Sequence, residues 1–159
     1  MVGYKYLVLS VFLFVGCTHK NLTTSAKQVV LTIKSPKIKY NDVALMKHNQ
    51  SSIQINGFFA GTNLFKLSIS KNICINKTCL TPSLFNSHFL SDRYENTILQ
   101  NILNKKPIFN AKKMIKTKNG FTQNIHNKYY KISYKVNVNS MYFKDTVNKI
   151  LIKLKDNNI

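Results

Sequence analysis

Acidic residues are scarce in this sequence of 159 residues, and tryptophan is absent. Only five Asp and Glu residues stand against 24 Lys and Arg residues, so the formal net charge is +19. The acids are separated along the chain, at Asp42, Asp92, Glu95, Asp145 and Asp156. No two of them suggest the pair of carboxylates that general acid–base chemistry or glycoside hydrolysis requires. This scarcity argues against a hydrolytic enzyme.

The residue types that build other catalytic or metal sites are also few and scattered. His48, His88 and His126 are isolated, and neither a G-x-S-x-G motif nor a glycine-rich phosphate loop occurs. We therefore expect no catalytic residues, no metal site and no cofactor. The sequence favours a binding protein or a structural protein over an enzyme.

No apolar run is long enough to cross a bilayer as a helix, which takes roughly 20 residues. The run 7–15 has instead the length of the apolar part of a secretory signal, with Lys5 before it and the small Gly16 after it. Three interpretations fit this pattern: a cleaved lipoprotein signal, an uncleaved anchor, or an ordinary signal followed by a buried cysteine.

The stretch LFVGC, residues 13–17, resembles a bacterial lipobox, with Phe14 where leucine is most frequent. The resemblance implies that residues 1–16 are a signal peptide and that the thiol of Cys17 accepts a diacylglycerol before cleavage. Thr18 follows, where enteric bacteria use Asp to keep lipoproteins at the inner membrane. The resemblance thus implies a lipid anchor in the outer membrane, with the protein facing the periplasm.

The charge of the remaining chain is high and evenly distributed. Removal of residues 1–16 takes away only Lys5 and leaves 23 Lys and Arg against five acids, or +18. Nucleic-acid readers favour arginine and clustered basic stripes, whereas this chain has one arginine and lysines that alternate with apolar residues. We expect no nucleic-acid partner. Codon bias toward Lys, Asn and Ile would explain the charge without a function, and anionic lipid head groups would use it, at about 1 kcal/mol for each well-placed Lys.

Cys74 and Cys79 lie close together in the stretch NICINKTCL. Export would place them in an oxidising compartment, and Asn76-Lys77 between them suits the turn of a hairpin. We expect a structural disulfide. A redox-active pair would more typically have CxxC spacing, and a metal site would need ligands beyond the isolated His88.

Polarity and periodicity divide the chain into a tether and one domain. Residues 17–27 are polar and aperiodic and predict a tether, and residues 28–159 are enough for a single domain. Alternating apolar residues from Val29 onward predict strands, with a turn at Asn41-Asp42. A hairpin is expected with its tip between Gly57 and Gly61.

The middle of the chain changes to helical periodicity. Thr81 followed by Pro82 predicts the start of a helix over 82–90. Asp92 and Glu95 resemble a capping pair for a second helix over 93–104. Strands return after these helices, with a hairpin turn at Asn119-Gly120. The order predicts an α+β domain in which a curved antiparallel sheet wraps two short helices that cover its concave face.

The order of elements from Ser51 to Ile159 resembles the family of the outer-membrane lipoprotein receptor LolB. The similar stretches are FFAGTNLFKLSIS (58–70), GFTQNIHNKYYKISYKV (120–136) and VNKILIKLKDNNI (147–159). The chain is also similar to the small lipoproteins of the Campylobacter and Helicobacter group. The LolB resemblance implies a half-barrel of antiparallel sheet closed by helices, which takes acylated lipoproteins from a periplasmic carrier.

The resemblance also implies two kinds of site residue. The membrane-contacting loop falls on Phe58, Phe59 and Ala60, with Ala60 where the family has a protruding leucine. An acyl-chain cavity would be lined by the inward residues of the strands, at Ile53, Ile55, Leu67, Ile69, Ile132, Tyr134, Ile150 and Ile152. The same eight residues would equally form a filled core, and the protein would then be a structural or interaction lipoprotein of the envelope.

Overall fold

The computed structural model describes residues 26–49, 51–59 and 61–157, and the account below is limited to them. The strands of this part are β1 (Lys27–Lys34), β2 (Lys39–His48), β3 (Ile53–Phe59), β4 (Thr62–Ile69), β5 (Ile73–Ile75), β6 (Thr78–Leu80), β7 (Met114–Thr117), β8 (Gly120–His126), β9 (Lys131–Asn137), β10 (Ser140–Asp145) and β11 (Ile150–Asp156). The helices are α1 (Pro82–Phe89), α2 (Ile98–Leu103) and the 3-10 turn η1 (Phe109–Ala111). None of the helices described is long and apolar enough to span a membrane.

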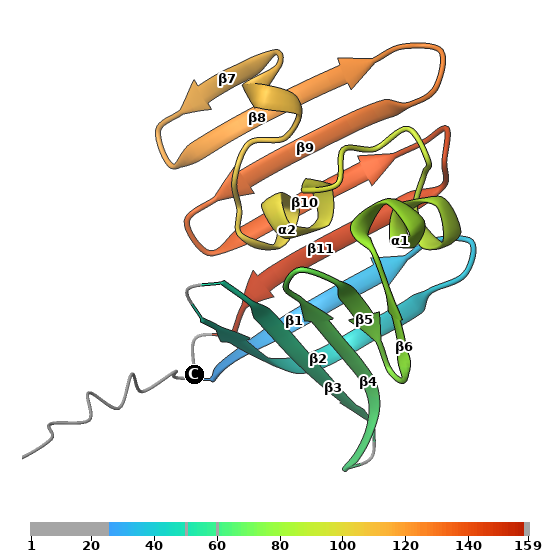
Figure 1. Cartoon of the computed structure of the whole chain (residues 1–159). Coiled ribbons are helices and arrows are strands. Elements are labelled where there is room, and N and C mark those ends of the chain that lie inside the picture. The colour runs from blue at the N-terminus through green and yellow to red at the C-terminus, as the bar shows by residue number, and fades with distance from the viewer. Residues whose placement is uncertain (1–25, 50, 60, 158–159) are drawn as a thin grey trace, which may run out of the picture.

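All of these strands belong to one antiparallel sheet, in the order β6-β5-β4-β3-β2-β1-β11-β10-β9-β8-β7 (Figure 1). The described part begins with β1 at the centre of the sheet and runs outward to the edge strand β6. It then crosses by way of α1 and α2 to the other edge, β7, and returns to β11, which pairs with β1. The expected antiparallel sheet with two helices is confirmed, as a mainly β architecture.

The two faces of the sheet differ in polarity because successive side chains of a strand point to opposite faces. In β11, Ile150, Ile152, Leu154 and Asp156 are buried, whereas Lys153 and Lys155 at alternate positions are exposed and Leu151 is half-buried. We call the face with the buried residues the inner face and the opposite one the outer face. The inner face carries the apolar core.

The connection that contains the helices packs against the same core. The four buried residues of α2 are Ile98, Leu99, Ile102 and Leu103. Two tyrosine hydroxyls join this connection to the sheet: Tyr94 donates to Asp145 Oδ2 (2.6 Å) and Tyr134 donates to the Lys106 carbonyl (3.0 Å). Since burial of a large apolar side chain stabilises by about 1.5–3 kcal/mol, a helix of six residues is held by its packing rather than by its length.

One expected helix start is confirmed and the other is wrong. Thr81 accepts a hydrogen bond from the Leu84 N–H (3.4 Å) at the start of α1, with Pro82 in the first turn. The second helix begins at Ile98 and not near residue 93. Glu95 does not cap it, because its carboxylate accepts from the distant Phe109 N–H (2.9 Å).

The turn expected at Asn41-Asp42 is also wrong, since both residues lie within β2. The chain turns earlier, where Ser35 N–H donates to the Ile38 carbonyl (2.8 Å) and Ser35 Oγ accepts from the Ile38 N–H (3.1 Å). The Asn41 side chain instead accepts from the Thr32 hydroxyl on β1 (2.6 Å). A contact between strands therefore outweighs the local preference of Asn-Asp for a turn.

Two other hairpins have the expected form. Cys74 and Cys79 form a disulfide and face each other across the β5–β6 pair, with Asn76 in the left-handed region at its turn (φ 52°). Gly120 faces Thr117 at the β7–β8 turn. The first strand begins at Lys27, which was expected to end the tether.

Candidate functional site

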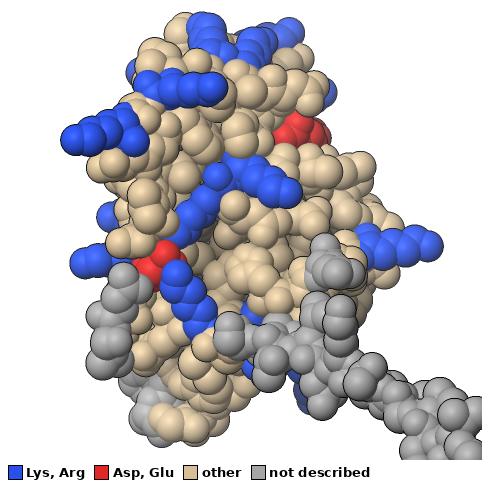
Figure 2. Space-filling model, turned by 90° about the vertical axis from the view of Figure 1, so that its left-hand side faces the viewer, with Lys and Arg blue, Asp and Glu red and all other residues tan. Residues whose placement is uncertain are grey.

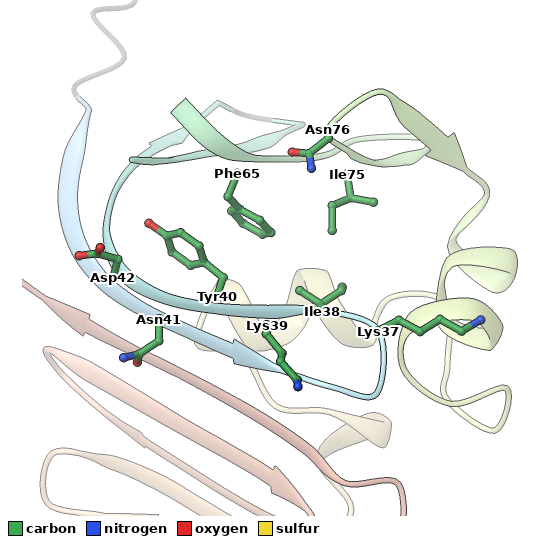
Figure 3. A pocket seen from close by; sticks show the side chains of 9 residues that line it. All are labelled: Lys37, Ile38, Lys39, Tyr40, Asn41, Asp42, Phe65, Ile75 and Asn76. Atoms are coloured by element: carbon green, nitrogen blue, oxygen red, sulfur yellow. The ribbon is translucent and has the colours of Figure 1, made fainter. Parts of the chain in front are cut away.

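A hollow of about 390 Å³ lies on the first half of the sheet, between β2, β4 and β5 (Figure 3). Its apolar wall is formed by Ile38, Tyr40, Phe65 and Ile75. The polar residues that complete the lining are Lys37, Lys39, Asn41, Asp42 and Asn76. We call it the Tyr40–Phe65 hollow, because these two rings stack with centroids 4.6 Å apart.

The hollow lies where the pairing between β2 and β3 ends, which we call the fork. β3 pairs with β2 only over Ala44 to His48, so the first residues of β2 have no partner on that side. The β3–β4 register then shifts between Gly57 and Phe58, which is an irregularity of the bulge type that bends a strand. Tyr40 and Ile75 are therefore only partly buried at this point, whereas Ile38 and Phe65 are buried in the core.

A glycine makes room for the tyrosine ring. A Cβ placed on Gly57 would lie 2.4 Å from the ring of Tyr40, closer than such atoms approach in proteins. The Tyr40 hydroxyl donates to the Val43 carbonyl (2.7 Å), which fixes the ring over β3. Partial burial, followed by the nearby charge of Asp42, raises the pKa of Tyr40, so its hydroxyl stays protonated at neutral pH.

The opposite wall is held by Asn76 at the β5–β6 turn. Its N–H donates to the Lys66 carbonyl (2.7 Å), and its side-chain oxygen accepts from the Lys66 N–H (3.0 Å). These bonds tie the turn to β4 beside Phe65. The lining as a whole offers an apolar wall with amine, amide and carboxylate groups around it, which suits a ligand with an apolar body and a polar end.

A second hollow, of about 350 Å³, lies at the opposite end of β1 and β2, beside the end of α2. The carboxylate of Asp156 meets Lys27 Nζ (2.8 Å) and Lys105 Nζ (2.9 Å) there. Burial alone would raise the pKa of Asp156, but the hydrogen bonds and charges of the two lysines outweigh it and lower the pKa. His48 lies at the rim, and partial burial together with the same lysines lowers its pKa.

Metal chemistry has no support in the described ranges, since these hold no group of three or more His, Cys, Asp or Glu residues placed to bind an ion. His88 Nδ1 lies 3.1 Å from the Leu84 carbonyl of its own helix. His126 is exposed on β8.

The eight residues expected to line an acyl-chain cavity are all in the core. Each of them is at most 2% exposed and belongs to the single apolar cluster that also includes α2. Tyr134 is the one with a polar group, and burial raises the pKa of its hydroxyl well above the usual range. Ile132 also borders a shallow hollow of about 290 Å³ on the outer face.

The other expected site residues are only partly described. Phe58 is half-buried near the end of β3. Phe59 ends the strand, and Ala60 lies outside the described residues. Cys17 and the expected signal peptide also lie outside them.

The sequence reasoning missed the residues of the Tyr40–Phe65 hollow. It placed a turn at Asn41-Asp42, directly after Tyr40, and so divided β2 into two runs. One signal was present, since a glycine in the middle of a strand often marks close approach by another group. Gly57 is that glycine, and the ring of Tyr40 is the group.

No protein-family model, no curated protein and no solved structure matches this chain. The fold places it among mainly β proteins with one antiparallel sheet and a helical crossover connection.

Proposed function

We propose that this protein is a lipid-anchored, non-catalytic protein of the outer membrane, facing the periplasm, that binds acyl chains of lipoproteins and helps to localise them there. The observation that carries the proposal is the Tyr40–Phe65 hollow. Its volume of about 390 Å³ lies in the range of small-ligand sites, about 300–1,000 Å³.

The chemistry of the lining supports an alkyl chain with a polar head. Ile38, Tyr40, Phe65 and Ile75 offer the apolar surface, and burial of an alkyl chain against it contributes about 25 cal/mol for each Å² removed from water. Lys37 and Asn76 stand at the polar side, where they would meet the ester or amide groups of an acylated peptide.

The proposed architecture is a half-barrel whose concave inner face is covered by α1 and α2. In this arrangement the centre of the sheet is filled, because the side chains of α2 and of the inner face pack together there. The acyl chain therefore enters at the fork between β2 and β3 rather than at the centre. Exchange needs no nucleotide, because the protein only has to bind the acylated ligand better than the carrier does.

The β3–β4 hairpin supports contact with a membrane in the same proposal. Phe58 lies near its end, one residue beyond the register shift at Gly57. Phe65 of the hollow lies on β4 at the base of this hairpin, opposite Gly57. We propose that Phe58, Phe59 and Ala60 touch the bilayer surface while the hollow receives the chain.

Native mass spectrometry with a synthetic triacylated peptide tests the proposal. The protein used in this experiment begins at Thr18, so it contains every residue that the structure describes. We expect saturable binding of one peptide. Ile75→Trp fills the hollow and lowers affinity about tenfold or more, which corresponds to about 1.4 kcal/mol or the loss of about 55 Å² of buried apolar area.

Ile115→Trp is the matched control, because Ile115 is 65% exposed on the edge strand β7. It makes the same substitution outside the hollow and should leave peptide affinity unchanged. An equal loss of peptide affinity in Ile75→Trp and Ile115→Trp would contradict the proposed site. Absence of peptide binding to both the native chain and Ile115→Trp would contradict it too.

The structural role is the second candidate, and the burial of the eight expected cavity residues favours it. A filled core is what a structural or interaction lipoprotein would have. Crosslinking in intact cells distinguishes the two functions, since a structural protein gives one stable envelope partner whereas a lipoprotein receptor gives many acylated ones.

A further inference from the structure

The outer face of the sheet carries many lysines. By strand alternation the lysines on this face are Lys34, Lys39, Lys47, Lys66, Lys131, Lys135, Lys144, Lys153 and Lys155, and all of them are exposed. In the view of Figure 2, basic side chains are spread over the molecule and acidic ones form small isolated areas. Basic side chains therefore outnumber acidic ones on the side shown in Figure 2.

None of the five acids lies on the outer face. Asp42, Asp145 and Asp156 belong to the inner face by their register, and Asp92 and Glu95 belong to the connection between β6 and β7. The lysines of the outer face therefore face one another or solvent. Lys34 of β1 lies directly opposite Lys39 of β2, and like charges in such a pair are destabilising, so an anionic partner would offset that cost.

The centre of this face combines lysines with an aromatic ring. Tyr142 of β10 lies opposite Lys135 of β9 and Lys153 of β11, and Lys153 Nζ is 5.5 Å from the centroid of its ring. A hollow of about 400 Å³ is formed here by residues of β9, β10, β11 and β1, including Thr32 and Lys155.

We infer that the outer face of β9, β10, β11 and β1 docks on a bilayer surface that presents anionic phospholipid head groups. Lysine amines pair with the phosphates, and Tyr142 has the apolar body and polar hydroxyl of side chains that sit at a membrane interface. Val30, which is 39% exposed beside this hollow, adds an apolar contact.

The position of β1 favours a bilayer over a soluble polyanion as the partner of this face. This strand follows the expected anchor Cys17 by ten residues and runs along the centre of the face, next to β11. The inference rests on the proposed lipid anchoring for this step. The anchor would hold the face near the membrane, and the face would set the orientation of the domain.

Vesicle co-sedimentation of the chain from Thr18 onward tests the inference. The vesicles are pure phosphatidylcholine or an equal mixture of phosphatidylcholine and phosphatidylglycerol. We expect binding to the mixture alone, weakening as salt is raised. The variant Lys135→Gln/Lys153→Gln/Lys155→Gln should bind about 100-fold more weakly or worse.

Three exposed lysines outside the outer face provide the control. The variant Lys71→Gln/Lys77→Gln/Lys106→Gln changes net charge by the same amount in two turns and in the helical connection. It should lose less than about threefold, because screening removes the effect of distant charges. Equal thermal midpoints of the two variants show that both are folded.

Two results would overturn the inference. Equal losses in the two variants would mean that total charge, and not this face, drives binding. Displacement from mixed vesicles by soluble polyphosphate, at the same phosphate concentration as the lipid, would mean that the face takes a free polyanion. Neither result involves Cys17. Failure of the proposed lipid anchoring is detected separately: palmitate is then not incorporated into the native chain, and Cys17→Ser makes no difference.

Discussion

The two halves of the sheet differ in the packing on their inner face. Beside β7–β10, buried polar groups lock the helical connection onto the strands, as where Gln123 bonds both backbone groups of Ile108. Beside β2–β6, the first residues of β2 are not paired with β3, and the Tyr40–Phe65 hollow lies there. A sheet that is continuous in hydrogen bonding is thus closed on one side and open on the other.

A buried carboxylate also joins the helical connection to the closed half. Asp145 is 0% exposed and accepts from the Tyr94 hydroxyl, the Asn148 side chain and three backbone N–H groups. Burial, followed by the bond and charge of Asp145, raises the pKa of Tyr94 far above its usual range. In the open half, Tyr40 stacks on Phe65.

Asp145→Ala should have the largest effect on this contrast. It leaves the Tyr94 hydroxyl and several N–H groups without an acceptor, and we expect a loss of about 3–5 kcal/mol in the free energy of unfolding. Urea unfolding followed by tyrosine fluorescence measures it. A loss below about 1 kcal/mol would show that the network is not what closes this half.

Gln123→Leu should come next. The side chain of Gln123 is fully buried and also donates to the Lys112 carbonyl (2.8 Å), so the substitution removes three hydrogen bonds. We expect about 2–3 kcal/mol lower stability, with faster amide exchange at Ile108. Exchange at Ile55 in the other half serves as the internal reference and should change only with global stability.

Gly57→Ala tests the position of the Tyr40 ring in the open half. The added methyl group meets the Tyr40 ring, so the ring must shift from its place over β3. We expect about 1–2 kcal/mol of destabilisation, together with weaker binding of the acylated peptide. Gly61→Ala is a comparison at the hairpin tip, where no atom lies within 4 Å of the added group but the positive φ of 79° adds strain. Only Gly57→Ala should alter peptide binding.

Lys105→Gln should have the smallest effect, and a pH-dependent one. The pKa of Asp156 is lowered in the folded state, so its contribution to stability is present above its ordinary pKa and is lost as the pH falls through the lowered value. Removal of Lys105 should cost about 1 kcal/mol at neutral pH, and the difference from the native chain should shrink below about pH 5. Urea midpoints at neutral pH and below about pH 5 measure this difference in stability. A difference between Lys105→Gln and the native chain that is the same at both pH values would contradict the assignment to Asp156.

The sequence predicts the strands best where alternation is unbroken. β9 follows its pattern of alternating inward apolar residues, β11 follows it apart from Leu151, and the Thr81-Pro82 and Asn119-Gly120 signals locate a helix start and a turn. These signals are local. The failures at Asn41-Asp42 and Glu95 both arise because a polar side chain bonds a distant partner, which no local pattern records.

The candidate site was harder to predict for a physical reason. The alternation at Ile132 and Ile152 identifies inward side chains but carries no information on whether α2 fills the space between them. The hollow arises from the lost pairing of β2 with β3 and the register shift after Gly57. Pairing across the sheet is set by the whole fold, so the position of the fork is not readable from one strand.

The most direct test of the central claim is photo-crosslinking with a triacylated peptide that carries a diazirine at the end of one acyl chain. After irradiation, peptide mass spectrometry locates the label. The account predicts labels on β2, β4 and β5 around Tyr40, Phe65 and Ile75. Labels concentrated on the inner face of β9–β11, or no saturable labelling, would contradict it.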